Sequence, residues 1–389
     1  MRTQVGIVGA GPAGLMLARL LEREGIEAVV LENRSRQYVE QRIRAGVLEQ
    51  RTADLLVEAG IGERMQREGI VHHGIELQFE DGRHRIPLSE LTGGSRIVVY
   101  GQTEIVKDLV AARLESGAPL LFEVEDVTLH DLETDRPRIE LTHDGRSVTL
   151  ECDVVAGCDG FHGVCRQALP DGVLRTFERD YAYAWLGILA AVAPSNDELV
   201  YSHHERGFAL LSLRGPELSR LYLQCRPDEE IDGWPDDRIW AELQRRLGLE
   251  SWTLAEGPIL EKGITGMRSF VAEPMQHGRL FLAGDAAHIV PPTGAKGLNL
   301  AISDVRMLAE ALAAFFRHGT EAALDSYSTR CLARVWRAEH FSWWMTSMLH
   351  RVEGGDPFDT RLQLSQLRYV TSSTAAATSL AENYVGLAG

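Results

Sequence analysis

The chain has 389 residues, of which 44% are hydrophobic and 25% are charged, a composition typical of a globular protein with two or three structural units. Its net charge of -16 disfavours binding to nucleic acid or to anionic membranes, and no run of about 18 apolar residues indicates a membrane span. Five cysteines without a CxxC pair argue against a disulfide framework or a zinc site and are typical of a reducing cytoplasm.

The N-terminal residues have the pattern of a β-α-β unit. Residues 4–8 form an apolar strand pattern, a Gly-rich turn and a helical pattern follow, and residues 28–31 form a second buried strand. In a G-x-G-x-x-G spacing, Gly9, Gly11 and Gly14 let the backbone approach a pyrophosphate at a helix N-terminus. Glu32, at the end of the second strand, is placed to accept hydrogen bonds from an adenosine ribose. The pattern predicts a parallel, Rossmann-like sheet.

The remaining patterns indicate a mixed α/β protein. The expected elements are helices at 47–59 and from Gln102, strands within 120–155 and 177–225, a strand at 279–283, and helices at 297–316 and onward to about 350. The strands after residue 177 are expected to form an antiparallel sheet with one solvated face. The tail after residue 354 has no clear pattern.

Three parts of the chain are expected to have different roles. Residues 1–175, completed by about 268–300, are predicted to bind the dinucleotide. Residues 176–267 are predicted to form a β-sheet substrate domain. Residues 301–389 are predicted to form a helical C-terminal region that includes an interface.

Two further motifs favour FAD over NAD as the bound dinucleotide. Asp159 and Asp285 each stand beside a glycine after an apolar strand, where a carboxylate can hold a ribose or ribityl hydroxyl. Each pair alone is common in turns. The three motifs in this order are a specific signal.

On these motifs the chain resembles the class A flavoprotein monooxygenases, FAD-dependent enzymes that hydroxylate aromatic rings. The similarity runs from the first strand to the last residues. The distinctive stretches are 42–50, 99–104, 156–163, 284–299, 341–345 and 382–387. The resemblance implies bound FAD, an aromatic acid, O2 and a nicotinamide coenzyme as reactants, a cytoplasmic enzyme and a homodimer.

The resemblance also assigns FAD contacts beyond the Gly-rich turn. Arg44 is expected at the pyrophosphate, because guanidinium groups match phosphate oxygens. The loop at 291–299 opens a long helix, whose free N–H groups and positive dipole end would stabilise the negative charge of a reduced flavin. The further expected contacts are Arg42, Val47, Gln102, Leu298 and Asn299.

The substrate is expected on the β segment. Arg214 would bind a carboxylate with two parallel hydrogen bonds, and Ser212 and Tyr222 would add further bonds. The other expected polar contacts are Tyr201, Arg220, Pro292 and Thr293. The expected apolar walls are Val47, Trp185, Leu199 and Leu210.

The resemblance implies a catalytic set that removes a proton from a substrate phenol. An aromatic ring attacks oxygen faster as a phenolate, yet a free phenol has a pKa of about 10. A chain from the substrate through Tyr201 and Tyr384 to His72 would carry the proton to solvent. Histidine fits the outer end because its charge changes near neutral pH. Pro292 completes the set.

The nicotinamide coenzyme has no second Gly-rich fingerprint and is expected to dock transiently. The resemblance points to Arg34, Tyr38, His162, Arg166 and Arg268. Arg34 and Arg36 can hold a 2′-phosphate, which favours NADPH and leaves NADH open.

The implied activity is hydroxylation of 4-hydroxybenzoate at C3, giving 3,4-dihydroxybenzoate through a flavin C4a-hydroperoxide. A first alternative is a hydroxylase of another aromatic acid, such as 4-aminobenzoate or 3-hydroxybenzoate. A second is a flavin-binding redox sensor without turnover. No metal ligand cluster is expected.

Overall fold

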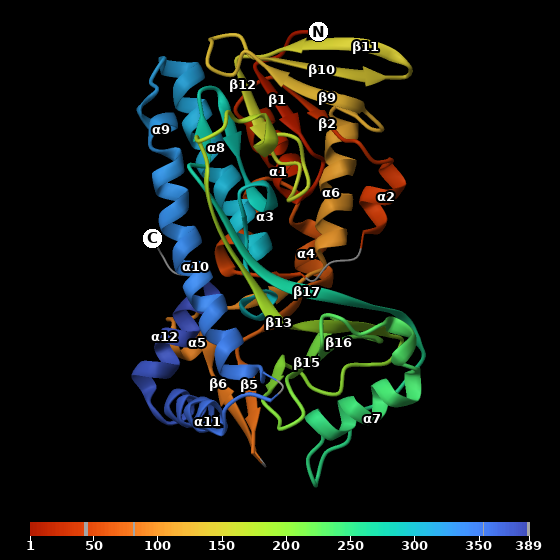
Figure 1. Ribbon diagram of the computed structural model, residues 1–389. Coiled ribbons are helices and arrows are strands. Elements are labelled where there is room, and N and C mark those ends of the chain that lie inside the picture. The colour runs from red at the N-terminus through yellow and green to blue at the C-terminus, as the bar shows by residue number, and fades with distance from the viewer. Residues whose placement is uncertain (43–45, 81, 353, 387–389) are drawn as a thin grey trace.

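The structure is a computed structural model that describes residues 1–42, 46–80, 82–352 and 354–386. Figure 1 shows a mostly parallel sheet in its upper half and a mostly antiparallel sheet in its lower half. Two long strands, β13 (Arg175–Ala190) and β17 (Ile259–Glu273), run between the halves, and helix α10 (Tyr327–Leu349) runs along their side. The mixed α/β class is confirmed.

The upper sheet confirms the predicted β-α-β unit. In spatial order its strands are β18 (Gln276–His277), β19 (Leu280–Leu282), β12 (Val154–Gly157), β1 (Val5–Val8), β2 (Ala28–Leu31) and β8 (Leu120–Leu121). All neighbours are parallel except β18 and β19. Parallel strands bury both faces, which is why β1, β2 and β12 are apolar throughout.

Different layers cover the two faces of the upper sheet. Helices α1 (Pro12–Arg23), α6 (Gln102–Glu115) and α8 (Gly297–His318) pack together on one side. A three-stranded sheet covers the other, made of β9 (Glu125–His130), β10 (Arg138–His143) and β11 (Arg146–Glu151). A Cβ on Gly6 would lie 2.7 Å from Ile139 and 2.9 Å from the Cys152 sulfur, so only glycine allows this close packing.

The lower sheet has eight strands. In order they are β20 (His288–Ile289), β17, β13, β16 (Leu218–Cys225), β15 (Ala209–Gly215), β14 (Val200–Ser202), β5 (Ile75–Phe79) and β6 (Gly82–Ile86). Neighbours are antiparallel except β14 and β5, which are parallel. The sheet therefore joins residues 75–86 to the strands predicted after residue 177.

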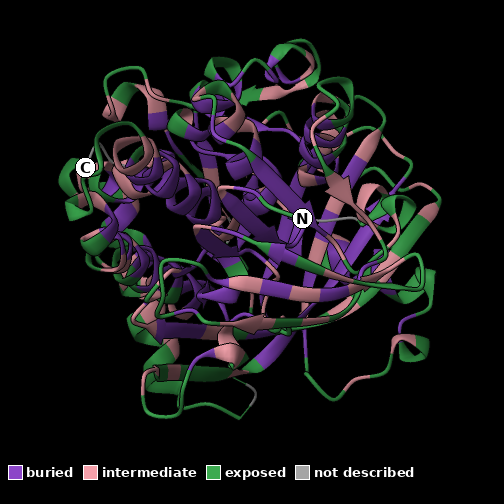
Figure 2. Ribbon diagram, turned by 90° about the horizontal axis from the view of Figure 1, so that it is seen from above, coloured by how far each residue is buried: buried purple, intermediate pink, exposed green. Residues whose placement is uncertain are grey.

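The expectation of one solvated face is wrong for the centre of this sheet. Helix α7 (Asp236–Leu247) covers one face, where Leu186 and Leu211 are buried. The other face packs against α11 (Pro357–Ser372) and α12 (Thr374–Val385), where Trp185 and Leu210 are buried. Seen from above in Figure 2, buried residues gather toward the middle of the molecule, and exposed residues lie mainly at its periphery. The helices come from distant parts of the chain, so the strand pattern alone does not reveal them.

Two local predictions also differ from the structure. Residues 47–59 are not one helix, because β3 (Val47–Leu48) pairs with β7 (Ile97–Val99) before α3 (Gln50–Glu58) begins. The tail without a clear pattern forms α11 and α12. The remaining elements are α2 (Arg36–Gln41), α4 (Glu63–Glu68), β4 (Ile70–His72), α5 (Leu88–Leu91) and α9 (Ala322–Asp325).

In the described ranges, none of the helices has the length and apolar character needed to cross a membrane. The same ranges contain no His, Cys, Asp and Glu group arranged to hold a metal ion.

Candidate active site

The Gly-rich turn at the start of α1 has the geometry of a phosphate cradle. Gly9 has a φ of +107°, and a Cβ there would lie 2.3 Å from the Cys158 carbonyl oxygen. A Cβ on Gly14 would lie 2.0 Å from the Gly9 carbonyl oxygen. A Cβ on Gly11, by contrast, would meet nothing within 4 Å. The turn therefore packs tightly on the protein side and leaves space in front of the helix N-terminus, which fits a pyrophosphate.

Glu32 is oriented by two backbone amides. Its Oε2 accepts a hydrogen bond from Ala10 N at 2.8 Å, and its Oε1 accepts one from Arg34 N at 2.8 Å. Each carboxylate oxygen has further acceptor capacity for a ribose hydroxyl. The position at the end of β2, beside the Gly-rich turn, fits an adenosine ribose.

The Asp159 carboxylate has one satisfied oxygen and one orphaned oxygen. Its Oδ2 accepts from Cys165 N at 2.8 Å, whereas its buried Oδ1 has no hydrogen-bond partner among the described residues. Burial raises the pKa of this carboxyl, although backbone amides oppose the shift. A buried acceptor without a partner is costly, so a hydroxyl donor from a bound ligand would fit here.

The Gly284–Asp285 turn is held from behind. Asp304 Oδ2 accepts from Gly284 N at 3.0 Å and lies 2.6 Å from His288 Nε2. Burial lowers the pKa of His288, but the Asp304 charge and hydrogen bond outweigh it and leave the pKa raised. The Asp285 side chain is exposed. The backbone of the turn is therefore fixed by Asp304, whereas the Asp285 carboxylate points to the surface and is accessible to a ligand.

The loop before α8 is built as a platform. Pro292 is exposed, Thr293 is fully buried, and Ala295 takes a left-handed conformation with a φ of 53° that is uncommon outside glycine. Asn299 clamps this loop: its Nδ2 donates to the Val47 and Ala295 carbonyls, each at 2.9 Å. Leu298 is half-buried. Asn299 thus holds the N-terminal end of α8 beside β3, the arrangement expected of a loop that contacts a flavin.

A buried ion pair next to this loop was missed from the sequence. Lys296 Nζ lies 2.6 Å from Glu49 Oε1 and donates to the Tyr384 carbonyl at 3.1 Å. Burial lowers the pKa of Lys296, and Glu49 opposes the shift. Both residues lie in stretches that carry the resemblance to the family. The lysine in a Gly-rich loop was the one sequence feature that could have indicated this ion pair. The pair places a cation between Tyr384 and the loop at 291–299, which is called the flavin loop below for its expected ligand.

The remaining predicted FAD contacts have different outcomes. The Arg42 carbonyl accepts from Thr103 Oγ1 at 2.9 Å, which ties the exposed Arg42 to the start of α6. Gln102 is the first residue of α6. Arg44 lies outside the described residues. The open Gly11 cradle, the Glu32 carboxylate and the orphaned Asp159 oxygen together fit FAD.

The predicted substrate residues share one face of the lower sheet. Tyr201 pairs with Leu210, Leu210 with Tyr222, and Ser212 with Arg220, so all these side chains point to the same side. This face also carries Trp185 and Leu199 in the apolar cluster beneath α12. The structure therefore brings predicted substrate residues from three strands to one side of the sheet.

Arginines lie at one end of this face. The Arg214 guanidinium carbon would be 2.8 Å from a Cβ on Gly101, so it rests on the start of α6. Burial lowers the pKa of Arg214, and nearby Tyr222 partly offsets the shift. Arg220 Nε donates to the Tyr222 hydroxyl at 3.3 Å. This end can bind a carboxylate.

Two phenols lie at the other end. The hydroxyls of Tyr201 on β14 and Tyr384 on α12 are 2.5 Å apart and buried. Burial raises the pKa of Tyr201, and the hydrogen bond to Tyr384 partly offsets this. The pair can exchange a proton.

His72 differs from its predicted place at the solvent end of this chain. It is 0% exposed, and neither ring nitrogen has a hydrogen-bond partner within the described part of the chain. Its strand β4 pairs with β7, which turns the ring inward. Burial lowers the pKa of His72 to about 4, against the opposing charge of Glu198. The ring is therefore neutral at neutral pH, and burial makes it a weaker base than an exposed histidine.

Three predicted coenzyme residues gather around the Phe161 ring. The Arg166 and Arg268 guanidinium carbons lie 4.8 and 4.9 Å from its centroid, and the His162 ring lies 5.0 Å away. Arg166 also donates to the Phe161 carbonyl at 2.6 Å and to the Ala286 carbonyl at 2.9 Å. Arg166 therefore joins the two Gly-Asp loops, while the exposed Arg268 and His162 face outward.

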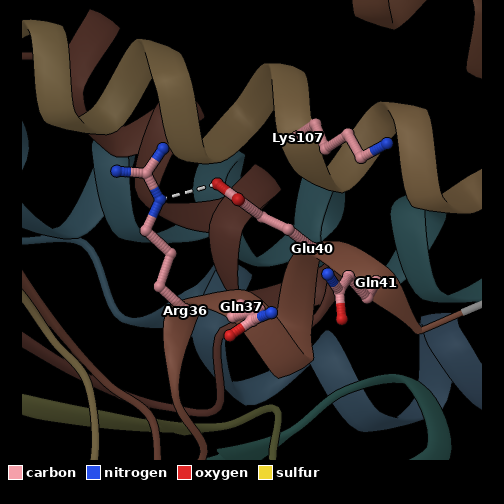
Figure 3. Close-up of a pocket in the computed structure, with 5 residues that line it drawn as sticks. All are labelled: Arg36, Gln37, Glu40, Gln41 and Lys107. Carbon is pink, nitrogen blue, oxygen red and sulfur yellow. Dashed lines mark hydrogen bonds and ion pairs between the residues drawn. The ribbon is translucent and has the colours of Figure 1, made fainter.

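Arg34 and Tyr38 form a second group on and before α2. The Arg34 guanidinium carbon lies 5.3 Å from the Tyr38 ring centroid. Figure 3 shows the adjacent hollow, of about 490 Å³, where Arg36 and Glu40 point toward each other and are 2.7 Å apart. The hollow is lined by Arg36, Gln37, Glu40, Gln41 and Lys107. Arg36 is thus paired with a carboxylate on its own helix, an exposed contact that a bound phosphate would have to replace.

Comparisons with known proteins agree with this site. The family described as "FAD binding domain" matches residues 2–342. The p-hydroxybenzoate hydroxylase of Acinetobacter baylyi is 50% identical over 100% of this chain and 96% of its own length. The 3-(3-hydroxy-phenyl)propionate/3-hydroxycinnamic acid hydroxylase of Mycolicibacterium gilvum is 28% identical over 83% of this chain and 56% of its own length.

The fold has solved counterparts as well. The p-nitrophenol 4-monooxygenase of Pseudomonas putida superposes with a TM-score of 0.85 over 100% of both chains at 20% identity, which supports the fold alone. The family match and the full-length relative carry the assignment further. This chain is an FAD-dependent enzyme of the FAD-binding-domain family, within the class A flavoprotein aromatic hydroxylases.

Proposed function

We propose that this enzyme hydroxylates 4-hydroxybenzoate at C3, converting it with NAD(P)H, H⁺ and O2 into 3,4-dihydroxybenzoate, NAD(P)⁺ and water. One observation carries the proposal: the same sheet face has a buried phenol pair at one end and the half-buried Arg214 guanidinium at the other. Tyr201 pairs with Leu210, and Arg214 lies four residues farther along β15, about 13 Å at the usual strand rise. An aromatic ring with a phenol and a carboxylate in para positions fits between them.

Binding and orientation are assigned to the strand residues. Arg214 would hold the substrate carboxylate in two hydrogen bonds, and Ser212 and Tyr222 would fix its plane. Leu199 and Leu210 would exclude water from the ring. The para hydroxyl would then lie at Tyr201, close to Pro292 of the flavin loop.

Proton removal is assigned to the tyrosine pair. Tyr201 would accept the substrate's phenolic proton while passing its own to Tyr384, with which it shares the 2.5 Å hydrogen bond. His72 would be the next acceptor, because neither of its ring nitrogens has a partner among the described residues. Its lowered pKa means that it would pass the proton on rather than keep it. Loss of this proton gives the electron-rich phenolate. Its ring carbon next to the C–O carbon is the atom that attacks oxygen.

FAD would be held by the Gly-rich turn, Glu32, Asp159 and Asp285, and when bound it supplies hydride acceptance and O2 activation. The loop from Pro292 and the α8 N-terminus would stabilise negative charge on it. The coenzyme would dock at His162 and Arg268, and Arg34 with Arg36 would favour NADPH over NADH.

We also propose a cytoplasmic homodimer. Phe358, Leu362 and Tyr369 are 65, 54 and 56% exposed and fall within about 40° of one another around α11, so a second copy of the chain would cover this stripe. Five buried free cysteines are compatible with a reducing compartment. Residues 1–175 with 268–300 would serve FAD binding, 176–267 the substrate, and 301–389 the interface.

The test is product identification. The holoenzyme is incubated with NADPH or NADH, O2 and a panel of 4-hydroxybenzoate, 3-hydroxybenzoate and 4-aminobenzoate, and products are separated by HPLC. We expect 3,4-dihydroxybenzoate in near one-to-one ratio to oxidised coenzyme. Turnover of another acid alone would reject 4-hydroxybenzoate as the substrate, and flavin without any coupled product would indicate a sensor.

A further inference from the structure

The C-terminal end of α10 connects the substrate face to the flavin loop through a chain of buried hydrogen bonds. Trp185 Nε1 on β13 donates to His350 Nε2 at 2.6 Å, and His350 Nδ1 lies 3.0 Å from the Thr346 carbonyl oxygen. Thr346 Oγ1 donates to Thr293 Oγ1 at 2.8 Å. All four residues are buried, and none of these bonds was predicted from the sequence.

The bonds require one arrangement of the His350 ring. A carbonyl oxygen only accepts, so Nδ1 carries the hydrogen and Nε2 has the lone pair that receives the Trp185 N–H. Burial lowers the pKa of His350 to about 3, which keeps this neutral form across the working range of the enzyme. A protonated ring would lose its acceptor for Trp185.

His350 is also held by ring stacking. Its centroid lies 4.3 Å from that of Phe208 and 4.7 Å from that of Tyr183, with small interplanar angles. Trp185 in turn lies 4.8 Å from the Tyr222 ring, which belongs to the proposed carboxylate end. The His350 ring thus fixes the rotation of an indole that supports a substrate-binding residue.

The flavin loop packs on the same helix. A Cβ on Gly294 would lie 2.8 Å from Ser342 Oγ and 3.2 Å from the Phe341 ring, so α10 leaves room only for glycine there. Because Thr346 donates to Thr293, the Thr293 hydroxyl retains its own proton for another acceptor. One helix end therefore sets the position of both the substrate wall and the flavin loop.

We propose that His350 is a positioning residue for hydroxylation, which holds Trp185 against the substrate face in fixed register with the flavin loop at Thr293. The inference rests on the proposed function. Without the Trp185–His350 bond the indole can rotate, the ring of the substrate is less constrained, and oxygen is released as H2O2 rather than transferred. Acids larger than a benzoate should then enter the pocket more readily.

The test compares three single variants in the FAD-loaded enzyme. His350→Phe keeps the stacked ring but removes both hydrogen bonds. His350→Gln restores them, because its amide can accept from Trp185 and donate to Thr346. His340→Phe is the matched control, since His340 is exposed on the same helix. Coenzyme oxidation, H2O2 and hydroxylated product are measured together.

We expect His350→Phe to lower the ratio of product to oxidised coenzyme by about threefold to tenfold, the scale of one hydrogen bond, with KM for 4-hydroxybenzoate changed much less. His350→Gln should recover most of the ratio, and His340→Phe should match wild type. Wild-type coupling in His350→Phe, or equal losses in the Phe and Gln variants, would overturn the proposal.

A double-mutant cycle tests the bond without substrate. Trp185→Phe removes the same hydrogen bond from its other side, so the loss of heat stability in Trp185→Phe/His350→Phe should be smaller than the sum of the two single losses. Additive losses would overturn the proposal. If wild type makes no product from 4-hydroxybenzoate while the cycle is non-additive, the proposed substrate fails and the bond stands.

Discussion

The hydroxyl oxygens of Tyr201 and Tyr384 lie 2.5 Å apart although the two residues are 183 positions apart in the chain. Tyr201 belongs to strand β14 of the lower sheet, and Tyr384 belongs to helix α12, which packs on that sheet. Replacing either hydroxyl therefore tests the proton path without removing a ring from the core.

Tyr201→Phe should bind 4-hydroxybenzoate but form little product. The ring volume is kept, while the group that accepts the phenolic proton is lost, so the substrate stays neutral and reacts slowly. H2O2 should replace most of the product. Tyr384→Phe should show a milder loss because it is one step farther from the substrate. Measuring coenzyme consumption, H2O2 and product in one assay checks this, and a fully coupled Tyr201→Phe enzyme would reject the path.

Arg214→Lys should weaken substrate binding and leave FAD bound. Lysine keeps the charge but cannot form two parallel hydrogen bonds to a carboxylate, a loss of about 1.5–3 kcal/mol. The Kd is measured from the change in the flavin spectrum on titration with 4-hydroxybenzoate. Arg238→Lys is the control, because Arg238 is an exposed arginine stacked on Trp234, away from the proposed site. An unchanged Kd would remove Arg214 from the site.

Glu40→Gln should increase the preference for NADPH over NADH. Glu40 engages Arg36 at 2.7 Å on a partly exposed helix, so neutralising it releases the guanidinium for a 2′-phosphate. Exposed ion pairs contribute up to about 1 kcal/mol, so roughly a fivefold change in the ratio of kcat/KM values is expected. Arg34→Ser should change the ratio in the opposite direction. Parallel changes for both coenzymes would show that the phosphate is bound elsewhere.

His72 should make the protein less stable as the pH falls from about 6.5 to about 4. Its pKa in the folded state is about 4, below the ordinary 6.5, so the unfolded chain binds more protons in this window. The free energy of unfolding should fall by about 3 kcal/mol over the window from this residue, at 1.36 kcal/mol per pKa unit. His350 shifts in the same direction.

The control for this pH effect is the neighbouring residue. Denaturant unfolding at several pH values should give a shallower slope for His72→Phe than for wild type. His73→Gln should keep the wild-type slope, because His73 is exposed and bonds only locally to Ser89. Identical slopes for wild type and His72→Phe would mean that His72 titrates normally.

Local sequence patterns were sufficient for the features that depend on neighbouring residues. The Gly9–Gly14 turn and Glu32 at the end of β2 follow from backbone geometry over a few positions. For the same reason, the start of α6 at Gln102 was predicted, and α8 was predicted close to its observed bounds.

Only the tertiary structure decided the contacts between distant segments. Residues far apart in the chain meet in the Lys296–Glu49 ion pair and in the Trp185–His350 hydrogen bond. The burial of His72 and the packing of the two tail helices likewise depend on distant segments. Such contacts form because apolar faces of helices and strands are buried against one another. The sequence pattern shows that a face is apolar, but it does not show which other element covers it. Candidate residues of the site could therefore be proposed from the sequence, whereas the contacts between them required the fold.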